Sequence, residues 1–136
     1  MIQRDTDITN LRPHITSVKV KENISENEYF QNTTLRPIIK LQNDIILYFF
    51  KNYIRSHKNV FYSLSSNKQL AYIDNALQKD NKLKNRLLGI VIGVFTTKEL
   101  LVYLEKDSVL NKRILGIINT KLKDSLQVLN APITEE

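Results

Sequence analysis

The residues that could do chemistry form a polar line along a segment that is otherwise apolar. Arg36, Lys40 and Asp44 are spaced four residues apart, and Asn43 lies beside them. On an α-helix this spacing places all three charged side chains on one face. Such a face could bind a ligand or a protein partner. Its commoner meaning is a solvated surface with a Lys40–Asp44 ion pair, so both interpretations stay open.

A binding site on this face would recruit polar residues from elsewhere in the chain. The full candidate ligand- or partner-binding set is Asn32, Arg36, Lys40, Asn43, Asp44, Asn111, Lys112 and Arg113. Gln42 falls inside the apolar stripe of the same segment. We expect it to be a hydrogen-bonded residue of the core, because buried amides are almost always paired.

The sequence contains no recognised catalytic or metal-binding motif. There is no cysteine, and His14 and His57 do not have the spacing of metal ligands. Glycine-rich phosphate loops and the G-x-S-x-G pattern are also absent. We therefore name no catalytic residue and expect neither a metal nor a cofactor. His57, near the end of a predicted helix, is expected to interact with its carboxyl-terminal dipole.

The charge of the chain allows a nucleic-acid alternative. The net charge is +6, with 20 basic and 14 acidic residues interleaved along the chain. Interleaved charge is more typical of a solvated surface than of a nucleic-acid footprint. If nucleic acid is the partner, Lys82, Lys84 and Arg86 are the candidate contacts.

The segment from residue 34 to 57 is predicted to be the central helix of the fold. Its apolar residues follow the spacing of one helix face, and Leu41, Leu47 and Tyr48 lie off that face, which indicates neighbours on two sides. Phe49 lies on the main stripe and is predicted to be buried. The stripe consists of Leu35, Ile38, Ile39, Ile45, Ile46, Phe49, Phe50, Tyr53 and Ile54.

Further helices are predicted at residues 26–32, 67–79, 81–95 and 97–106, and from residue 108 to before Pro132. Ser25 with Glu28, and Thr96 with Glu99, match capping boxes. Pro37 either lies in the first turn of the central helix or kinks one continuous helix that begins earlier. In the 97–106 helix we expect leucines 100, 101 and 104 to face inward. The glycines at 89, 93 and 116 are expected to allow close helix packing.

These elements predict an all-α protein, an irregular bundle of five to six helices around the central helix. Residues 1–24 are expected to be an extended or partly disordered arm, 25–130 a single helical domain, and 131–136 a tail. No secretory signal is visible, and the longest apolar run, residues 87–95, is too short for a membrane span. We therefore expect a cytoplasmic protein without a membrane partner.

Part of the chain resembles a group of small, uncharacterised bacterial proteins. The resemblance lies in FQNTTLRPIIKLQND at residues 30–44 and in the spacing to GVFT at 93–96, Tyr103 and NKR at 111–113. It covers most of the chain after the arm and implies an all-helical fold but no established activity. Some such proteins carry a glyoxalase label. The glyoxalase fold has βαβββ units with His and Glu metal ligands on strands, a pattern that this sequence lacks, so no catalytic residue is carried over.

The leading functional hypothesis is a non-enzymatic protein–protein interaction module, with a homodimer as one form of it. It is based on the two-sided apolar central helix and the absence of catalytic patterns. A nucleic-acid or ribosome-associated factor is the first alternative, and a basic stripe on one face would favour it. An enzyme or small-molecule-binding protein is the second, and it requires a deep pocket where Arg36, Asn43 and Asp44 converge.

Overall fold

The structure, a computed structural model, describes residues 2–13 and 24–132. Every regular element within these ranges is helical, which confirms the predicted all-α class. His14 and the predicted tail after residue 132 lie outside the described residues.

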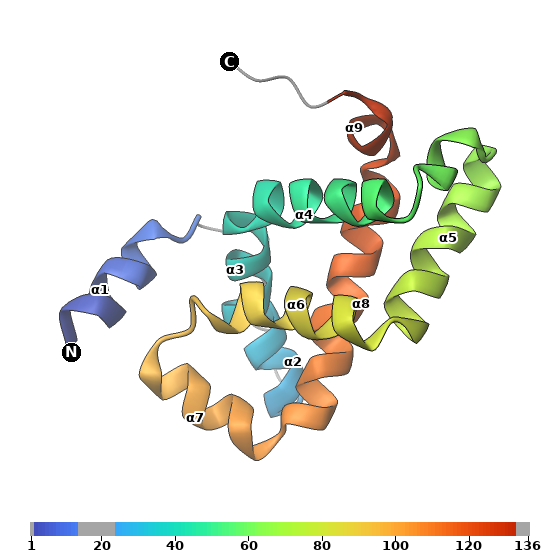
Figure 1. The fold of residues 1–136 in the computed structure, drawn as a ribbon. Helices are drawn as coiled ribbons and strands as arrows, with labels where there is room; N and C mark the ends of the chain where they lie inside the picture. Colours follow the sequence, from blue (N-terminus) through green and yellow to red (C-terminus); the bar gives the residue numbers. More distant parts are fainter. Residues whose placement is uncertain (1, 14–23, 133–136) are drawn as a thin grey trace.

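The described chain has more helices than the five to six predicted (Figure 1). They are α1 (Ile2–Leu11), α2 (Glu26–Phe30), the π-helical segment η1 (Gln31–Leu35), α3 (Arg36–Leu41), α4 (Asn43–Ser56), the 3-10 segment η2 (Val60–Ser63), α5 (Ser66–Lys79), α6 (Asn81–Ile92), α7 (Thr97–Glu105), α8 (Asp107–Asp124) and α9 (Leu126–Asn130).

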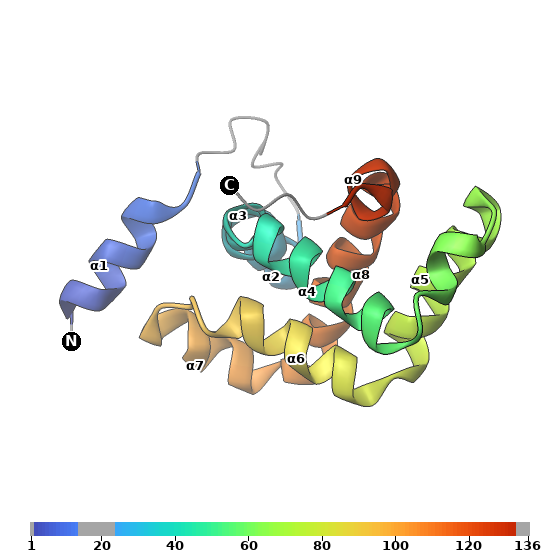
Figure 2. The ribbon, with the colours of Figure 1, turned by 45° about the horizontal axis from the view of Figure 1, so that its top comes forward.

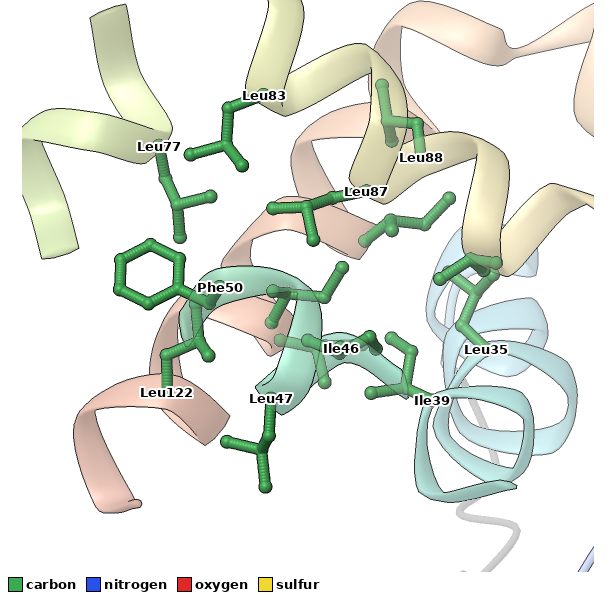
Figure 3. Packing of buried hydrophobic residues seen from close by; sticks show 14 of the residues in the cluster. Leu35, Ile39, Ile46, Leu47, Phe50, Leu77, Leu83, Leu87, Leu88 and Leu122 are labelled. Carbon is green, nitrogen blue, oxygen red and sulfur yellow. The ribbon is translucent and has the colours of Figure 1, made fainter. Parts of the chain in front are cut away.

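The element with the most extensive packing is α8, rather than the predicted central helix. It packs against η1, α3, α5, α6, α7 and α9, whereas α4 packs mainly against α3, α6 and α9. Figure 3 shows the core that these helices enclose, where Ile46 and Phe50 of α4 gather with Leu87 of α6 and Leu122 of α8. Phe50, Leu87 and Leu122 are completely buried.

The predicted 34–57 helix is interrupted at Gln42. Its backbone leaves the helical region there (φ −91°, ψ 8°), and its side-chain Nε2 donates to the carbonyl of Ile90 at 3.0 Å, as expected for a paired amide. The chain stays helical through Pro37, because the turn before it is π-helical, with the N–H of Arg36 donating to the carbonyl of Gln31. A wider turn accommodates the proline ring, which would press on a carbonyl in an α-helix.

The interruption changes which face of α4 is buried. Ile45 is 53% exposed and Phe49 is only half-buried, whereas Leu47 and Phe50 are buried. Phe49, predicted to be buried, is only partly so and packs against the edge of the core, and Ile45 departs from the predicted stripe. The expected stripe assumed one unbroken helix, and the break at Gln42 rotates α4 relative to α3. The buried Lys51 donates from Nζ to the carbonyl of Ala131 at 2.7 Å, which attaches the end of α9 to α4.

Two further expectations about packing are wrong. Leu101 and Leu104 of α7 are 66% and 57% exposed, and Tyr103 faces the core instead. The reason is that α7 lies at the edge of the bundle with one main neighbour, α8, so it buries a single narrow face. A Cβ placed on Gly89 or Gly116 would meet no atom within 4 Å, so neither glycine is required for close packing.

Within the segment 1–24, expected to be an extended or partly disordered arm, the structure has a helix, α1, and residues 14–23 of that segment lie outside the described residues. Polar contacts attach α1 to the turn between α6 and α7, which is about 90 residues away in sequence. Arg4 donates to the carbonyls of Phe95 (2.9 Å) and Gly93 (3.1 Å). Arg12 forms a bidentate pair with Glu99, with distances of 2.6 and 2.7 Å. Glu99 also completes the predicted capping box with Thr96.

We expect acid to detach α1 from this turn. Burial alone would raise the pKa of Glu99, but hydrogen bonds from Arg12 and Thr96 and the charge of Arg12 outweigh it and hold the pKa below its ordinary 4.5. The Arg12–Glu99 pair therefore stabilises the attachment of α1 fully above pH 4.5. This stabilisation is lost as the pH falls through the lowered pKa of Glu99. Because the chain has no cysteine, Asn10→Cys and Ser108→Cys can carry a donor–acceptor dye pair.

Energy transfer between the two dyes should fall as the pH is lowered from 7 through the depressed pKa of Glu99, while far-UV circular dichroism stays helical. The Arg12→Gln variant is the control and should show low transfer already at pH 7. The assigned role of the Arg12–Glu99 pair would be contradicted if energy transfer stayed high in the wild type at low pH and also in Arg12→Gln at pH 7.

Candidate functional site

A groove of about 620 Å³ opens along one side of α8. Its other walls come from η1 and from the first residues of α3 and α4. On this side α8 packs against η1 and α3, and Figure 1 shows the α2–α3 segment running beside it. We call it the α8 groove, and it is lined by Gln31, Arg36, Asn43, Arg113, Gly116, Ile117, Thr120, Lys121, Asp124 and Ser125.

Helical periodicity explains how α8 supplies most of this lining. Arg113, Gly116, Thr120 and Asp124 follow one another at intervals of three or four residues, so their positions form a continuous stripe along the helix. Arg36 reaches the groove from the first position of α3. The groove therefore combines segments that are about 80 residues apart in sequence.

Side-chain amides hold the two guanidinium groups of the groove. The Nε of Arg36 donates to Oδ1 of Asn32 at 3.2 Å, one helical turn earlier. The Nη1 of Arg113 donates to Oε1 of Gln31 at 2.7 Å. A neutral amide orients a guanidinium without cancelling its charge, which a carboxylate would do.

The groove has an excess of positive charge. Arg36, Arg113 and Lys121 face a single acidic lining residue, Asp124. Among the described residues, no carboxylate oxygen forms an ion pair with any of these three cations, that is, none lies within 4.0 Å of their side-chain nitrogens. Arg113 and Lys121 are half-buried, so solvent screens them less than it screens fully exposed charges. An anion is the ligand that this arrangement would stabilise.

The structure brings part of the predicted candidate set to the groove. Arg36, Asn43 and Arg113 line it, and Asn32 supports Arg36 from outside. The pocket where Arg36, Asn43 and Asp44 converge is thus only partly present, because Asp44 is exposed and does not line the groove.

The other predicted residues lie elsewhere. Lys40 is exposed, and the expected Lys40–Asp44 ion pair does not occur, because the break at Gln42 separates the two turns. Lys112 is exposed outside the groove, and Asn111 accepts a hydrogen bond from the hydroxyl of Tyr103.

Sequence reasoning missed several lining residues of α8. Thr120, Lys121, Asp124 and Ser125 lie at its carboxyl-terminal end and were not among the candidates. A signal was available, because polar or small residues recur at intervals of three or four after Arg113.

The alternative nucleic-acid residues are not all gathered in one place. Lys82 and Arg86 line a hollow of about 120 Å³ beside His57, while Lys84 donates to the carbonyl of Gln78 at 3.0 Å. The ring Nδ1 of His57 lies 2.8 Å from the carbonyl of Tyr53, at the end of α4 where a dipole partner was expected.

A third hollow, of about 600 Å³, lies beside this one and is lined partly by Tyr53, Tyr72 and Asp80. Its most perturbed group is Tyr53, whose hydroxyl donates to Asp80 at 3.2 Å. Burial, together with the charge of Asp80, raises the pKa of Tyr53 to about 12. This phenol therefore remains protonated at neutral pH and provides no base or nucleophile there.

Within residues 2–13 and 24–132, no three His, Asp or Glu side chains are grouped so as to hold a metal ion. None of the helices described in these ranges is both long enough and apolar enough to cross a membrane. No protein-family model matches the chain, and comparisons with curated proteins and with solved structures gave no match either. The chemistry of the α8 groove is therefore the basis for assigning a function.

Proposed function

We propose that this protein binds a small organic phosphate in the α8 groove. The observation that carries the proposal is that Arg36, Arg113 and Lys121 line one groove without a carboxylate partner among the described residues. The volume of about 620 Å³ is in the usual range for small-molecule sites. Of the functions considered from the sequence, small-molecule binding is the one that this geometry supports best.

The chemistry of the groove fits a phosphate ester better than a simple ion. A guanidinium group can donate two parallel hydrogen bonds to two oxygens of the same phosphate, and a lysine adds a compact positive charge. The side chains of Asn43 and Ser125 make no hydrogen bond to any other described residue, so both can donate to a ligand. Asp124 would repel a second phosphate but accept a hydrogen bond from a hydroxyl or amino group.

The floor of the groove provides space for the organic part of the ligand. Ile117 contributes apolar surface, and Gly116 has no side chain to fill the space above it. The proposal is for ligand binding.

Calorimetric titration with AMP, inorganic phosphate, citrate and a short single-stranded RNA tests this proposal. We expect AMP to bind with a dissociation constant on the order of 10⁻⁴ M or tighter, and inorganic phosphate to bind more weakly. The Gly116→Leu variant should abolish binding, because its side chain would occupy the groove without changing the charge.

Gly89→Leu is the matched control, since Gly89 is also helical, exposed and free of contacts at its Cβ. It should bind AMP as the wild type does. Equal binding by both variants, or preference for RNA over every small anion, would contradict the assignment of the groove to an organic phosphate.

A second candidate function, protein–protein interaction, is favoured by a separate observation. Leu101 and Leu104 of α7 are 66% and 57% exposed, and Val102 between them is 40% exposed. Adjacent exposed apolar residues on one helix are typical of contact surfaces for other proteins. This surface is formed by α7 and shares no residue with the α8 groove.

A further inference from the structure

The outward face of α7 has an apolar centre and charged ends. With 3.6 residues per turn, positions 98, 101, 102 and 105 lie on the side of the helix opposite the buried Tyr103. Leu101 and Val102 form the centre, and Lys98 and Glu105 lie on either side along the helix axis. Both views of the ribbon place α7 at the edge of the bundle (Figures 1 and 2).

The two charged residues of this face have no partner within the described structure. Lys98 and Glu105 are exposed, and neither forms an ion pair or hydrogen bond with another described residue. Their order is also unfavourable for the helix itself. Lys98 lies in the first turn and Glu105 is the last residue of α7, whereas the helix dipole favours acidic residues first and basic residues last.

An antiparallel copy of the same helix would satisfy both charges. With a two-fold axis between Leu101 and Val102, position 98 of each copy faces position 105 of the other. Each Lys98 then meets a Glu105 from the second copy, and each Leu101 meets a Val102. The contact occurs twice because a two-fold interface uses the same surface on both subunits.

We propose that the protein forms a homodimer through antiparallel packing of α7 against α7 of a second copy. Two features support a second copy of this chain as the occupant. The apolar centre needs an apolar surface, and the charges at its ends are complementary to the same face turned through 180°. This inference is independent of the α8 groove and of what the groove binds.

The dimer should be reversible. A contact centred on one helix of nine residues covers less than the area of about 1,200 Å² typical of stable complexes. We therefore expect monomers at about 10 µM and a substantial fraction of dimers near 1 mM, a range that sedimentation equilibrium can follow.

Charge exchange tests the antiparallel geometry. Lys98→Glu and Glu105→Lys each place like charges opposite each other twice, so each should raise the dissociation constant about tenfold. The double variant Lys98→Glu/Glu105→Lys restores the pairing and should dimerise as the wild type does. A mixture of the two single variants should also dimerise, since every contact between them joins opposite charges.

Leu101→Glu tests the apolar centre and should abolish the dimer, while the control Val128→Glu, at an exposed position of α9, should leave it intact. A monomer at every concentration would overturn the proposal. If the double variant does not recover, the antiparallel arrangement is wrong. If the wild type is monomeric and Leu101→Glu melts at a lower temperature than the wild type, another part of the same chain covers this face. That result would also overturn the proposal.

Discussion

Replacing Phe50 with alanine should lower the free energy of unfolding by about 3–5 kcal/mol. Phe50 is completely buried, and its ring contacts three other aromatic rings. It stacks on Tyr53 with 5.5 Å between centroids and meets the edges of Phe61 and Tyr72 at 6.5 and 6.4 Å. Truncation would remove these contacts and leave a cavity where α4, α5 and η2 meet.

The adjacent residue provides a control of the same type. Phe49 is half-buried beside a small hollow, so Phe49→Ala should cost less than half as much. Urea unfolding curves of the two variants measure the difference. Equal losses, or a loss below about 1 kcal/mol for Phe50→Ala, would show that the face of α4 has been assigned incorrectly.

The second large effect concerns ligand affinity. The double variant Arg36→Gln/Arg113→Gln should weaken AMP binding by about 100-fold or more. Hydrogen bonds to charged groups contribute about 1.5–3 kcal/mol each, and each 1.4 kcal/mol corresponds to a tenfold change. The fold should survive, because neither arginine belongs to the buried core.

Arg55→Gln/Arg86→Gln is the control, since it removes the same charge from two exposed arginines outside the groove. Calorimetric titration should show nearly unchanged AMP affinity for this variant. If both double variants lose affinity equally, binding depends on the overall charge of the protein, and the groove is not a specific site. That result would revive the nucleic-acid alternative.

The local signals in the sequence predicted many helix boundaries correctly. The helix predicted from residue 81 begins at Asn81 as α6, and Thr96 with Glu99 forms the expected box at the start of α7. The box at Ser25 forms only in part, because Ser25 accepts from the amide of Glu28 while the return bond from the Glu28 side chain is absent. Caps depend on residues three positions apart, so a single sequence can reveal them.

Orientation and long-range attachment could not be predicted in the same way. The rotation of α4 follows from the break at Gln42, whose amide bonds to Ile90 in another helix. The attachment of α1 depends on Arg4 and Arg12 reaching carbonyls more than 80 residues away. Neither interaction produces a periodic pattern, so hydrophobic periodicity gives no sign of it.

The candidate site was predicted only in part, because some of its residues also come together through long-range packing. Arg36 and Asn43 were identified because the spacing along their own segment drew attention to them, and Arg113 was included as a recruited residue. Lys121 and Asp124 continue the spacing that follows Arg113, but they were missed because only the packing of α8 against η1 and α3 makes this stripe a wall of the groove. The contact of Arg36 with Asn32 joins residues four apart, whereas the contact of Arg113 with Gln31 spans 82 residues and is visible only in three dimensions.

The most direct test of the α8 groove is to observe its arginines while a ligand is added. Nuclear magnetic resonance of the Nε–Hε groups, assigned through single Arg→Lys variants, can follow each arginine during a titration with AMP. We predict that the signals of Arg36 and Arg113 shift together and saturate with one dissociation constant, while those of Arg55 and Arg86 stay in place. Saturable shifts at Arg55 or Arg86 instead, or no saturable shift at Arg36 and Arg113, would contradict the proposed function.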